Sequence, residues 1–430
     1  MTEPDFDVIV VGAGIAGSVA AYQLAQAGLS VVLIERGESA GSKNLSGAVL
    51  YPRVLTDIFP TFLNDAPIER KIDRNKIIFL NENSWVGLDY GDHRLYDAGT
   101  AVTVLRAHLD SWLADQAESA GAMVMTGVRV DSLLRENGRI VGVVAGDEQL
   151  RSHVVIAADG ANSFLARDAG LRPQPTTTQQ AVGIKALIKL GSSVIEERFD
   201  LSTDQGVAYA IVGDCTQGLA GGGFLYTNTE TISVGIVLRL DELVASQRRS
   251  VDVFDHYLTH PYIDALLRGG ELLEYGCHLV NEGGQAMMGP LVFDGLVIAG
   301  DAAGLTLNTG LTIRGMDLAL GSAVASAQAV IEALAKGDTS AHGLANYTTY
   351  LSQSFVGQDM KLYSKAPHFL ENQRLYGDYG QLLADVLHGV FNLDTTPHRH
   401  LLATAHQALK NSGIGLTQLV KDGFAGMRAL

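Results

Sequence analysis

Cysteine is scarce in this chain. Only Cys215 and Cys277 occur in 430 residues, and neither has a second cysteine close by in the sequence. The chain therefore cannot supply a four-cysteine iron–sulfur cluster by itself, and any such cluster must be carried by a partner. The scarcity also fits a reducing compartment, in which each cysteine acts as a small buried apolar residue. No metal site is predicted.

Basic residues are also in short supply. The chain has 31 lysines and arginines against 47 aspartates and glutamates, which gives a formal net charge of −16. No compensating basic cluster is visible in the sequence. A phosphate backbone is therefore an unfavourable partner, and nucleic-acid binding is not expected.

Long apolar runs are missing too. No window reaches 18 uninterrupted apolar residues, and the acidic start MTEPDFD leads directly into an apolar strand. We therefore expect neither a signal peptide nor a transmembrane segment, and a cytoplasmic chain. The C-terminal stretch GIGLTQLVKDGFAGMRAL has apolar spacing that would suit peripheral contact with the inner face of the cell membrane, or packing against a partner subunit or the core.

Residues 7–36 carry the strongest signal. Apolar, mostly β-branched residues at 8–11 predict a buried strand, glycines follow in G-x-G-x-x-G spacing, and a helix then leads to a second strand at 31–34. In such a βαβ unit Gly12 allows a tight turn, Gly14 lets the backbone approach a pyrophosphate, and Gly17 lets helix and strand pack closely.

Glu35 stands at the end of the second strand, about 20 residues after the glycines, where a carboxylate can accept both hydroxyls of an adenosine ribose. The combination of strand, glycine turn, helix and acid predicts a dinucleotide site. The alternative is a purely structural glycine turn.

Two further segments are ambiguous from the residues alone. The polar loop with Lys43, Asn44, Ser46 and Gly47 suits a polar ligand, although an ordinary surface loop looks much the same. Arg106 stands where a strand changes into a helix. It can reach a diphosphate or ribityl chain, or it can form a surface ion pair.

The middle of the chain predicts a second, sheet-built domain. Residues 76–90 read as a hairpin, and residues 179–282 read as a mostly antiparallel sheet interrupted by one amphipathic helix near 253–267. The aromatic residues Phe224, Tyr226 and Tyr209 are placed on the roof of a substrate cavity, with burial in the core as the alternative.

The dinucleotide domain resumes after this sheet. An apolar strand from residue 296 ends at Gly300–Asp301, just as the strand at 154–157 ends at Asp159–Gly160. An acid at the end of a parallel strand is well placed to bind sugar hydroxyls. A long helix is predicted from about residue 312 through 334, and its start at 309–311 is expected to offer free amides to a reduced ring system.

The fold class is therefore α/β, with a discontinuous organisation. The dinucleotide domain is expected at 1–75, 101–175 and 290–340, the antiparallel-sheet domain at 76–100 and 176–289, and a helical C-terminal region at 341–430.

Taken together, GAGIAG with Glu35, the ADGANS turn and the LVIAGDAAG strand resemble the FAD-binding pattern of the glutathione-reductase-like flavoprotein superfamily, with an interleaved substrate domain of the p-hydroxybenzoate-hydroxylase type. The resemblance implies one FAD, whose ring carries the chemistry without a catalytic side chain. The FAD-binding residues expected from it are Gly12, Gly14, Ala16, Gly17, Glu35, Arg36, Ser46, Gly47, Arg106, Val130, Asp159, Gly160, Gly300, Asp301, Thr309 and Gly310.

A closer resemblance is to the FixC family, relatives of electron-transfer-flavoprotein:quinone oxidoreductase. It rests on segments spread over nearly the whole chain, namely GSKNLSGAVLYP at 41–52, VLRAHLDSWL at 104–113, ADGANSFLA at 158–166, AVGIKALI at 181–188, GGGFLYTN at 221–228 and AGDAAGLTLNTGLTIRGMDLA at 299–319.

Such proteins accept electrons from electron-transfer flavoprotein subunits, pass them toward quinone, and work with a small ferredoxin-like protein. The resemblance implies the same here. Because this chain has no cysteine after Cys277, it resembles the shorter FixC type, in which the cluster is on a separate polypeptide.

The same resemblance places the loop at Ser46–Gly47 and the segment 308–310 beside the flavin ring, with Lys185 and Phe224 on the electron-acceptor side. A bulky change at Gly310 is then expected to lower the midpoint potential.

Two alternatives share the three motifs. One is a FAD-dependent monooxygenase or prenyl-chain reductase that uses NAD(P)H. The monooxygenase form is weakened because Ala166 stands where aromatic hydroxylases usually have an arginine. The other is a non-catalytic flavin-binding subunit that scaffolds a complex.

Overall fold

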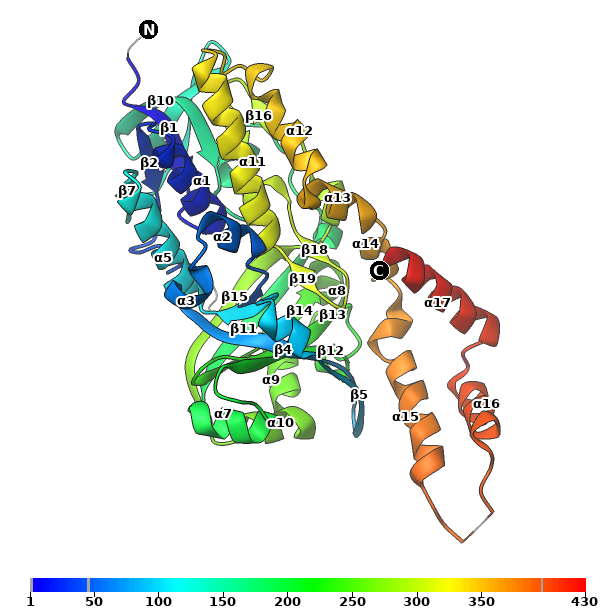
Figure 1. Ribbon diagram of the computed structural model, residues 1–430. Coiled ribbons are helices and arrows are strands. Elements are labelled where there is room, and N and C mark those ends of the chain that lie inside the picture. Colours follow the sequence, from blue (N-terminus) through cyan, green and yellow to red (C-terminus); the bar gives the residue numbers. More distant parts are fainter. Residues whose placement is uncertain (1–2, 45–46, 396) are drawn as a thin grey trace.

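The computed structural model describes residues 3–44, 47–395 and 397–430, and it arranges them around two β-sheets with a helical arm at the C-terminal end (Figure 1). The first sheet has eight strands, with β16-β17-β10-β1-β2-β7 as its main order and β8 and β9 attached to β10. Its strands are β1 (Phe6–Val11), β2 (Val31–Ile34), β7 (Met123–Met125), β8 (Ser132–Glu136), β9 (Arg139–Ala145), β10 (Glu148–Ala157), β16 (Val292–Phe293) and β17 (Leu296–Ile298).

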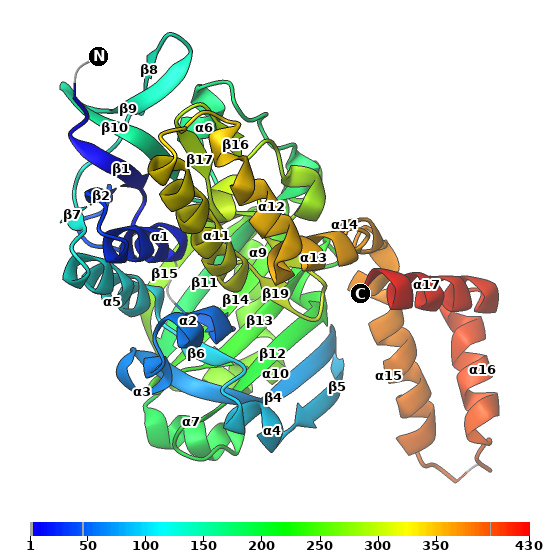
Figure 2. The ribbon, with the colours of Figure 1, turned by 45° about the horizontal axis from the view of Figure 1, so that its top comes forward.

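The centre of this sheet is parallel and buried. β1 pairs in parallel with β2 and β10, and β10 pairs in parallel with β17. Helices α1 (Ile15–Gln26), α5 (Arg106–Ser119) and α11 (Met316–Ala335) pack beside it, with α1 against both others (Figure 2). The βαβ unit predicted at 7–36 is confirmed, because its apolar strand residues are buried on both faces as a central parallel strand requires.

The second sheet has nine strands in the main order β15-β11-β14-β13-β12-β4-β6-β3, with β5 paired to β4. Its strands are β3 (Ala48–Leu50), β4 (Ile68–Asn81), β5 (Ser84–Gly91), β6 (Val102–Val104), β11 (Gln180–Lys189), β12 (Gln205–Gly213), β13 (Gly221–Thr227), β14 (Thr231–Arg239) and β15 (Glu271–Asn281). The predicted hairpin at 76–90 is confirmed as β4–β5, and the sheet is antiparallel except where β4 meets β12.

Short helices cover one face of this second sheet. α7 (Ser192–Phe199), α9 (Ser250–Thr259) and α10 (Pro261–Leu267) share a hydrophobic core with its strands (Figure 1). The single amphipathic helix predicted near 253–267 was wrong, because Pro261 has no backbone N–H and begins a new helix. The remaining short helices of the two-sheet body are α2 (Arg53–Ile58), α3 (Phe62–Asp65), α4 (His93–Asp97), α6 (Phe164–Asp168) and α8 (Leu240–Ser246).

The division into domains stays a prediction. The chain crosses between the sheets repeatedly, and β3 and β6, which were expected in the dinucleotide domain, pair in the nine-stranded sheet. β4 runs across the expected boundary at residue 75.

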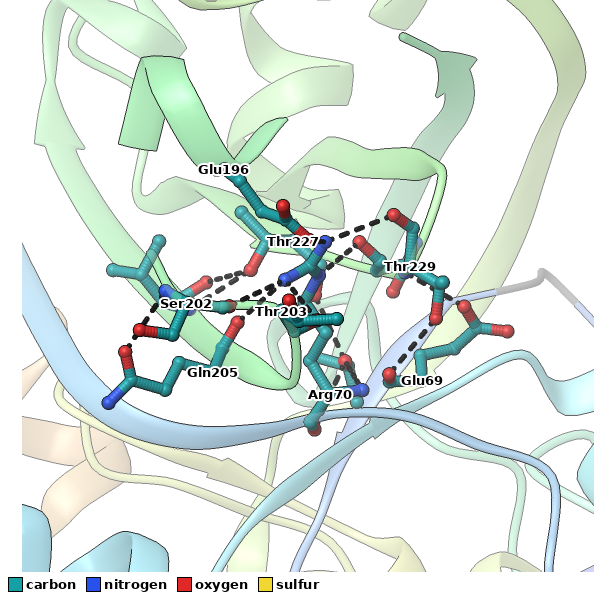
Figure 3. Close-up of polar contacts among 11 residues, drawn as sticks. Glu69, Arg70, Glu196, Ser202, Thr203, Gln205, Thr227 and Thr229 are labelled. Carbon is teal, nitrogen blue, oxygen red and sulfur yellow. Dashed lines mark hydrogen bonds and ion pairs between the residues drawn. The ribbon is translucent and has the colours of Figure 1, made fainter. Parts of the chain in front are cut away.

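Arg70 on β4 is a buried cation that ties separate parts of the second sheet together (Figure 3). Its guanidinium donates to five backbone carbonyls and pairs with the Glu196 carboxylate at 3.3 Å. The carbonyls belong to Ser202 at 3.2 Å, Thr203 at 2.9 Å, Gln205 at 3.0 Å, Asn228 at 2.7 Å and Thr229 at 3.1 Å. All the N–H groups that leave water are therefore used, as burial of a charge requires.

The C-terminal helices divide into two groups. α12 (Asn346–Gln353) and α13 (Phe355–Leu362) pack against α11 and complete the main core. After α14 (Ala366–Phe369), helices α15 (Asp378–Phe391), α16 (Leu401–Ser412) and α17 (Leu416–Ala429) form an arm that projects from the body in both views (Figures 1 and 2). The arm has a small core of its own around Leu382, Ala408 and Ile414.

Within the part of the chain that the structure describes, α11 is the one helix long and apolar enough to cross a membrane. In its apolar window 67% of the residues are buried inside the molecule, as in a core helix.

Candidate functional site

A cavity of about 720 Å³ is lined by residues from both sheets. Most of the predicted cofactor-binding residues are on its wall, although they come from segments as distant as β1 and β17. These residues are Gly12, Gly14, Ala16, Glu35, Arg36, Arg106, Val130, Asp159, Gly160 and Asp301. The structure therefore gathers the three motifs into one site.

Five predicted residues, Gly17, Gly47, Gly300, Thr309 and Gly310, are not on this wall, and Ser46 lies outside the described residues. Two of the five are packing positions. A Cβ on Gly17 would lie 1.9 Å from the Gly12 carbonyl oxygen, and one on Gly300 would lie 2.8 Å from the Ala16 Cβ. These glycines therefore let α1 approach its neighbours closely.

Two glycines of the turn after β1 are required for different structural reasons. Gly12 has φ +101° and a Cβ there would lie 2.4 Å from the Ala158 carbonyl oxygen, so the position accepts only glycine. Gly14 precedes α1 with φ −79°, and the nearest atom to an added Cβ is the Arg106 Nη2 at 3.8 Å. The protein itself leaves room at Gly14, and that room is part of the cavity.

Glu35 closes the turn from the side of β2. Its Oε2 accepts a hydrogen bond from the Ala13 N–H at 3.0 Å, and its Oε1 accepts one from the Gly37 N–H at 2.7 Å. The carboxylate is thus fixed by two backbone amides at the cavity wall. Each oxygen keeps a lone pair that can accept a ligand hydroxyl.

Arg106 is held rigidly at the start of α5. Its Nε and Nη2 donate to the two carboxylate oxygens of Asp110, each at 2.8 Å, one helical turn away. Asp110 is fully buried and also accepts from Asn44 at 2.7 Å. A fork-shaped ion pair of this kind fixes the guanidinium plane, so its remaining N–H groups point in a defined direction.

Two carboxyl groups lie on the wall where strands β10 and β17 end. Asp159 accepts a hydrogen bond from the Leu165 N–H at 3.0 Å, and burial raises the pKa of its carboxyl. Burial also raises the pKa of Asp301, against the opposing charges of Arg106 and His278. Both groups are therefore shielded from water and suited to hydrogen bonding with a polar ligand.

The helix start predicted at 309–311 was wrong. Residues 307–314 form a small hairpin of β18 (Leu307–Asn308) and β19 (Ile313–Arg314), and α11 begins only at Met316, after Gly315. Gly310 has φ +76° at the hairpin turn, and its N–H donates to Asn308 Oδ1 at 2.7 Å. Gly315, Met316, Asp317 and Ala319 are the wall residues where α11 begins.

Several wall residues were not predicted. Asn281 is the last residue of β15 and Glu282 follows it, and burial raises the pKa of Glu282, which accepts from Asn308 at 3.1 Å. Asp317 at the start of α11 pairs with Arg314. In the sequence these residues stand out only as polar residues close to the end of a strand or the start of a helix. Their residue types do not identify a ligand.

Aromatic residues and one lysine form the part of the wall that belongs to the nine-stranded sheet. Phe224 and Tyr226 stack at 5.1 Å between ring centroids, and Lys185 lies 5.5 Å from the Phe224 ring. Tyr209 is instead in the core on the other side of the sheet, so its predicted place in the cavity was wrong. In the described residues no group of three or more histidines, cysteines, aspartates or glutamates could hold a metal ion.

Comparison with known families gives two matches. Residues 5–201 match the FAD binding domain, and residues 366–430 match the C-terminal domain of the ETF-QO/FixC family. The chain is 46% identical over 433 residues to a probable electron transfer flavoprotein-quinone oxidoreductase, YdiS, of Escherichia coli strain K12, and 42% identical over 432 residues to protein FixC of the same strain. Both alignments cover 100% of each chain.

Solved structures share the fold at lower identity. A geranylgeranyl bacteriochlorophyll reductase-like protein from Thermoplasma acidophilum superposes with a TM-score of 0.68 at 22% identity, covering 97% of this chain and 98% of that one. The flavin-dependent brominase Bmp2 superposes with a TM-score of 0.65 at 16% identity, with the same coverage. These similarities confirm the predicted fold class.

The residues of the cavity fit an FAD. Asp159 Oδ1, Asn281 Oδ1 and Asp317 Oδ1 are buried oxygens without a hydrogen-bond partner among the described residues, and all three residues are on the wall. Buried polar atoms are normally paired, so a ligand with several donors is expected there. FAD supplies sugar and ribityl hydroxyls and a ring N–H, and the space at Gly14 suits its pyrophosphate.

Proposed function

The chain belongs to the ETF-QO/FixC family of FAD-dependent oxidoreductases, and on that premise we propose that it accepts electrons from an electron-transfer flavoprotein and passes them toward a quinone or a small ferredoxin-like protein. FAD is its cofactor. The observation that carries the proposal is the full-length similarity to YdiS, which extends through the C-terminal arm and so is not limited to the FAD-binding fold.

In this proposal the cavity holds the FAD in an extended form. Glu35 accepts from the adenosine ribose, the amides of the turn at residues 12–14 and Arg106 hold the pyrophosphate, and Asp301 accepts from the ribityl chain. Phe224 and Tyr226 of the aromatic wall would lie beside the ring, which would supply reversible two-electron transfer.

The arm is the proposed contact region for partners. Large apolar side chains are exposed on it, among them Phe391 at 76% and Leu402 at 83%. A cytoplasmic location with peripheral contact at the inner face of the membrane would bring a lipid-soluble quinone within reach. With only two cysteines in the chain, a cluster for onward transfer belongs to the ferredoxin-like partner.

Anaerobic rapid mixing tests the proposal. The FAD-loaded protein is mixed with a reduced electron-transfer flavoprotein, and the absorbance of oxidised flavin bound to the chain is followed. We expect rapid bleaching, and recovery of the absorbance on adding a quinone or an oxidised ferredoxin.

The control replaces the reduced flavoprotein with NADPH. Bleaching by NADPH alone, with oxygen uptake on adding an aromatic compound, would favour a monooxygenase. Bleaching by NADPH with reduction of a prenyl chain would favour a reductase. If the FAD stays oxidised with both reductants, the result would contradict an enzymatic function and favour a non-catalytic subunit that scaffolds a complex.

A further inference from the structure

Lys185 is placed unusually in the sheet that forms the aromatic wall. Its cross-strand neighbours are Gly235 on β14 and Gly276 on β15, and Phe224 follows Gly235 in the same row on β13. A Cβ on Gly235 would lie 2.3 Å from Phe224 Cζ, so the Phe224 ring covers that glycine. On both adjacent strands, the residue directly opposite Lys185 is therefore a glycine, and the lysine is part of the cavity wall.

The end of the lysine side chain is held on two sides. Nζ donates a hydrogen bond to the Gly47 carbonyl and lies 5.5 Å from the centroid of the Phe224 ring. Gly47 is itself pressed onto the sheet, because a Cβ there would lie 1.8 Å from Ser233 Oγ. The ammonium group is thus fixed between the loop after residue 46 and the aromatic wall.

The charged and titratable groups around Lys185 come from several elements. Glu274 and His278 flank Gly276 on the same face of β15, because alternate residues of a strand share a face. Arg106 at the start of α5 faces the same cavity, and so do Asp301 after β17 and Tyr226 on β13. The charge of Arg106 is already paired with Asp110.

Burial lowers the pKa of Lys185 to about 8, with a further lowering from Arg106 that outweighs the opposing charge of Glu274. Near neutral pH the group is therefore close to its own titration range, unlike an ordinary lysine. A new negative charge beside it would favour the protonated form.

Lys185 lies in the part of the cavity where we expect the ring of the cofactor. Glu35 directly follows β2 of the eight-stranded sheet and marks the adenosine end, whereas Lys185 belongs to β11 of the other sheet. An extended dinucleotide that passes Gly14 and Arg106 reaches the nine-stranded sheet with its ring. This step rests on the binding mode in the proposed function, but not on the identity of the electron donor or acceptor.

We propose that Lys185 is the proton-binding cation that stabilises the negatively charged reduced flavin. Two electrons arrive from the donor and one proton from solvent enters the ring, which leaves the ring with one negative charge. Where Nζ is neutral beforehand, a second proton from solvent binds to Nζ, so the lysine becomes an ammonium group beside the new anion. Where Nζ is already charged, only the ring takes up a proton.

A redox titration of the FAD-loaded protein against pH tests this coupling. A two-electron midpoint potential falls by about 30 mV per pH unit when one proton is taken up and by about 59 mV when two are taken up. We expect the wild-type slope to steepen above a pH of about 8, because Nζ is then neutral before reduction. A wild-type slope that does not steepen would overturn the proposal.

Two variants and a control locate the effect. In Lys185→Met the steepening disappears, and at neutral pH reduced FAD binds at least tenfold more weakly relative to oxidised FAD, a fall of about 30 mV in the midpoint potential. Lys185→Arg keeps the positive charge but does not titrate, so it keeps the potential at neutral pH and loses the steepening. If Lys185→Met does not bind FAD, Lys185→Arg still tests the proposal through the loss of the steepening.

The matched control is Lys76→Met. Lys76 belongs to the same sheet and lies 5.3 Å from the Tyr209 ring, but it pairs with Asp89 at 3.0 Å and is not on the cavity wall. We expect the wild-type pH profile from it. A steepening that persists in both Lys185 variants overturns the proposal. Because chemical mediators set the potential, this result is independent of whether a flavoprotein donor reduces the chain.

Discussion

At the scale of single residues, Gly14 in the first turn and Gly17 in the first turn of α1 serve different purposes. Gly14→Ala places a methyl group in the cavity, with no protein atom closer than 3.8 Å. We expect the FAD-free protein to keep its melting temperature, while the dissociation constant of FAD rises about tenfold or more because the pyrophosphate loses its close approach. Fluorescence titration with FAD measures the affinity.

The comparison variant is Gly17→Ala. Its methyl group would lie 1.9 Å from the Gly12 carbonyl oxygen, so helix and strand must separate. We expect a lower melting temperature even without FAD. Equal loss of stability in both variants would contradict the assignment of Gly14 to the ligand.

Arg70 illustrates a second residue-scale effect. Arg70→Met leaves five carbonyls without their donor, one of them on the buried Asn228 and four partly buried, and each buried group left unsatisfied costs about 1–3 kcal/mol. We expect a loss of at least about 3 kcal/mol in the free energy of unfolding, measured by urea denaturation of the FAD-free protein.

Arg53→Met is the control for removing an arginine. Its ion pair with Asp57 is on the surface, with 85% of the arginine side chain exposed, so we expect almost no change. An equally small change in the free energy of unfolding of Arg70→Met would show that water replaces the hydrogen bonds of the Arg70 guanidinium.

At the scale of elements, the hairpin of β18 and β19 changes what is expected of Gly310. Gly310→Ala forces an alanine into φ +76°, which costs about 1 kcal/mol or more, and Leu370 Cδ2 is already 3.1 Å from the new Cβ. Because Gly310 is not on the cavity wall, we expect a lower melting temperature with an unchanged midpoint potential. A shifted potential in the FAD-loaded variant would instead place the turn beside the ring.

An ionic contact joins the last helix of the arm, α17, to Arg374, which lies just before α15. Although burial alone would raise the pKa of Asp422, hydrogen bonds from Arg374 at 2.7 Å and from Tyr379 hold it well below the usual range. A depressed pKa stabilises the folded arm above the unfolded value of about 4, and this stabilisation is lost as the pH falls further. We expect hydrogen exchange in α17, corrected for intrinsic rates, to accelerate below about pH 4 while α11 stays protected.

Asp422→Asn should show the faster exchange in α17 already at neutral pH. Asp385→Asn is the matched control, because Asp385 is partly exposed on α15 and accepts a hydrogen bond from Gln381 one turn away within the same helix. An arm that is equally protected in both variants would mean that its apolar contacts alone hold it.

The elements also show what the sequence could and could not predict. The βαβ unit at 7–36 was predictable because its signals are local, namely an apolar strand, fixed glycine spacing and a helical repeat. The hairpin at 307–314 was not, since glycine, asparagine and threonine are typical of both a turn and a helix start.

Sheet register was the second obstacle. Tyr209 pairs with Leu225, and so it faces the core, whereas Phe224 and Tyr226 on either side of Leu225 face the cavity. No pattern within β12 or β13 reveals which residues stand opposite each other. Arg70 was missed for a related reason, because its partners are carbonyls from two segments that are distant from it in the sequence, 202–205 and 228–229.

At the scale of the whole molecule, one cofactor connects two sheets. Its site has walls from both, so binding should stabilise them together instead of one at a time. At a free FAD concentration of 100 times the dissociation constant, we expect about 2.7 kcal/mol of added stability. Hydrogen exchange should slow in both β1 and β11, and should slow much less in Gly14→Ala at the same FAD concentration. Slowing limited to one sheet would contradict a shared site.

The interleaving of the two sheets also has a consequence for biosynthesis. The glycine turn leaves the ribosome early, but the wall is incomplete until residues 301–319, which run from the end of β17 into the first turn of α11, have been made. A nascent chain that lacks them has no enclosed pocket for the flavin. Cofactor loading is therefore a late event, and translation stalled before this point should yield a colourless polypeptide.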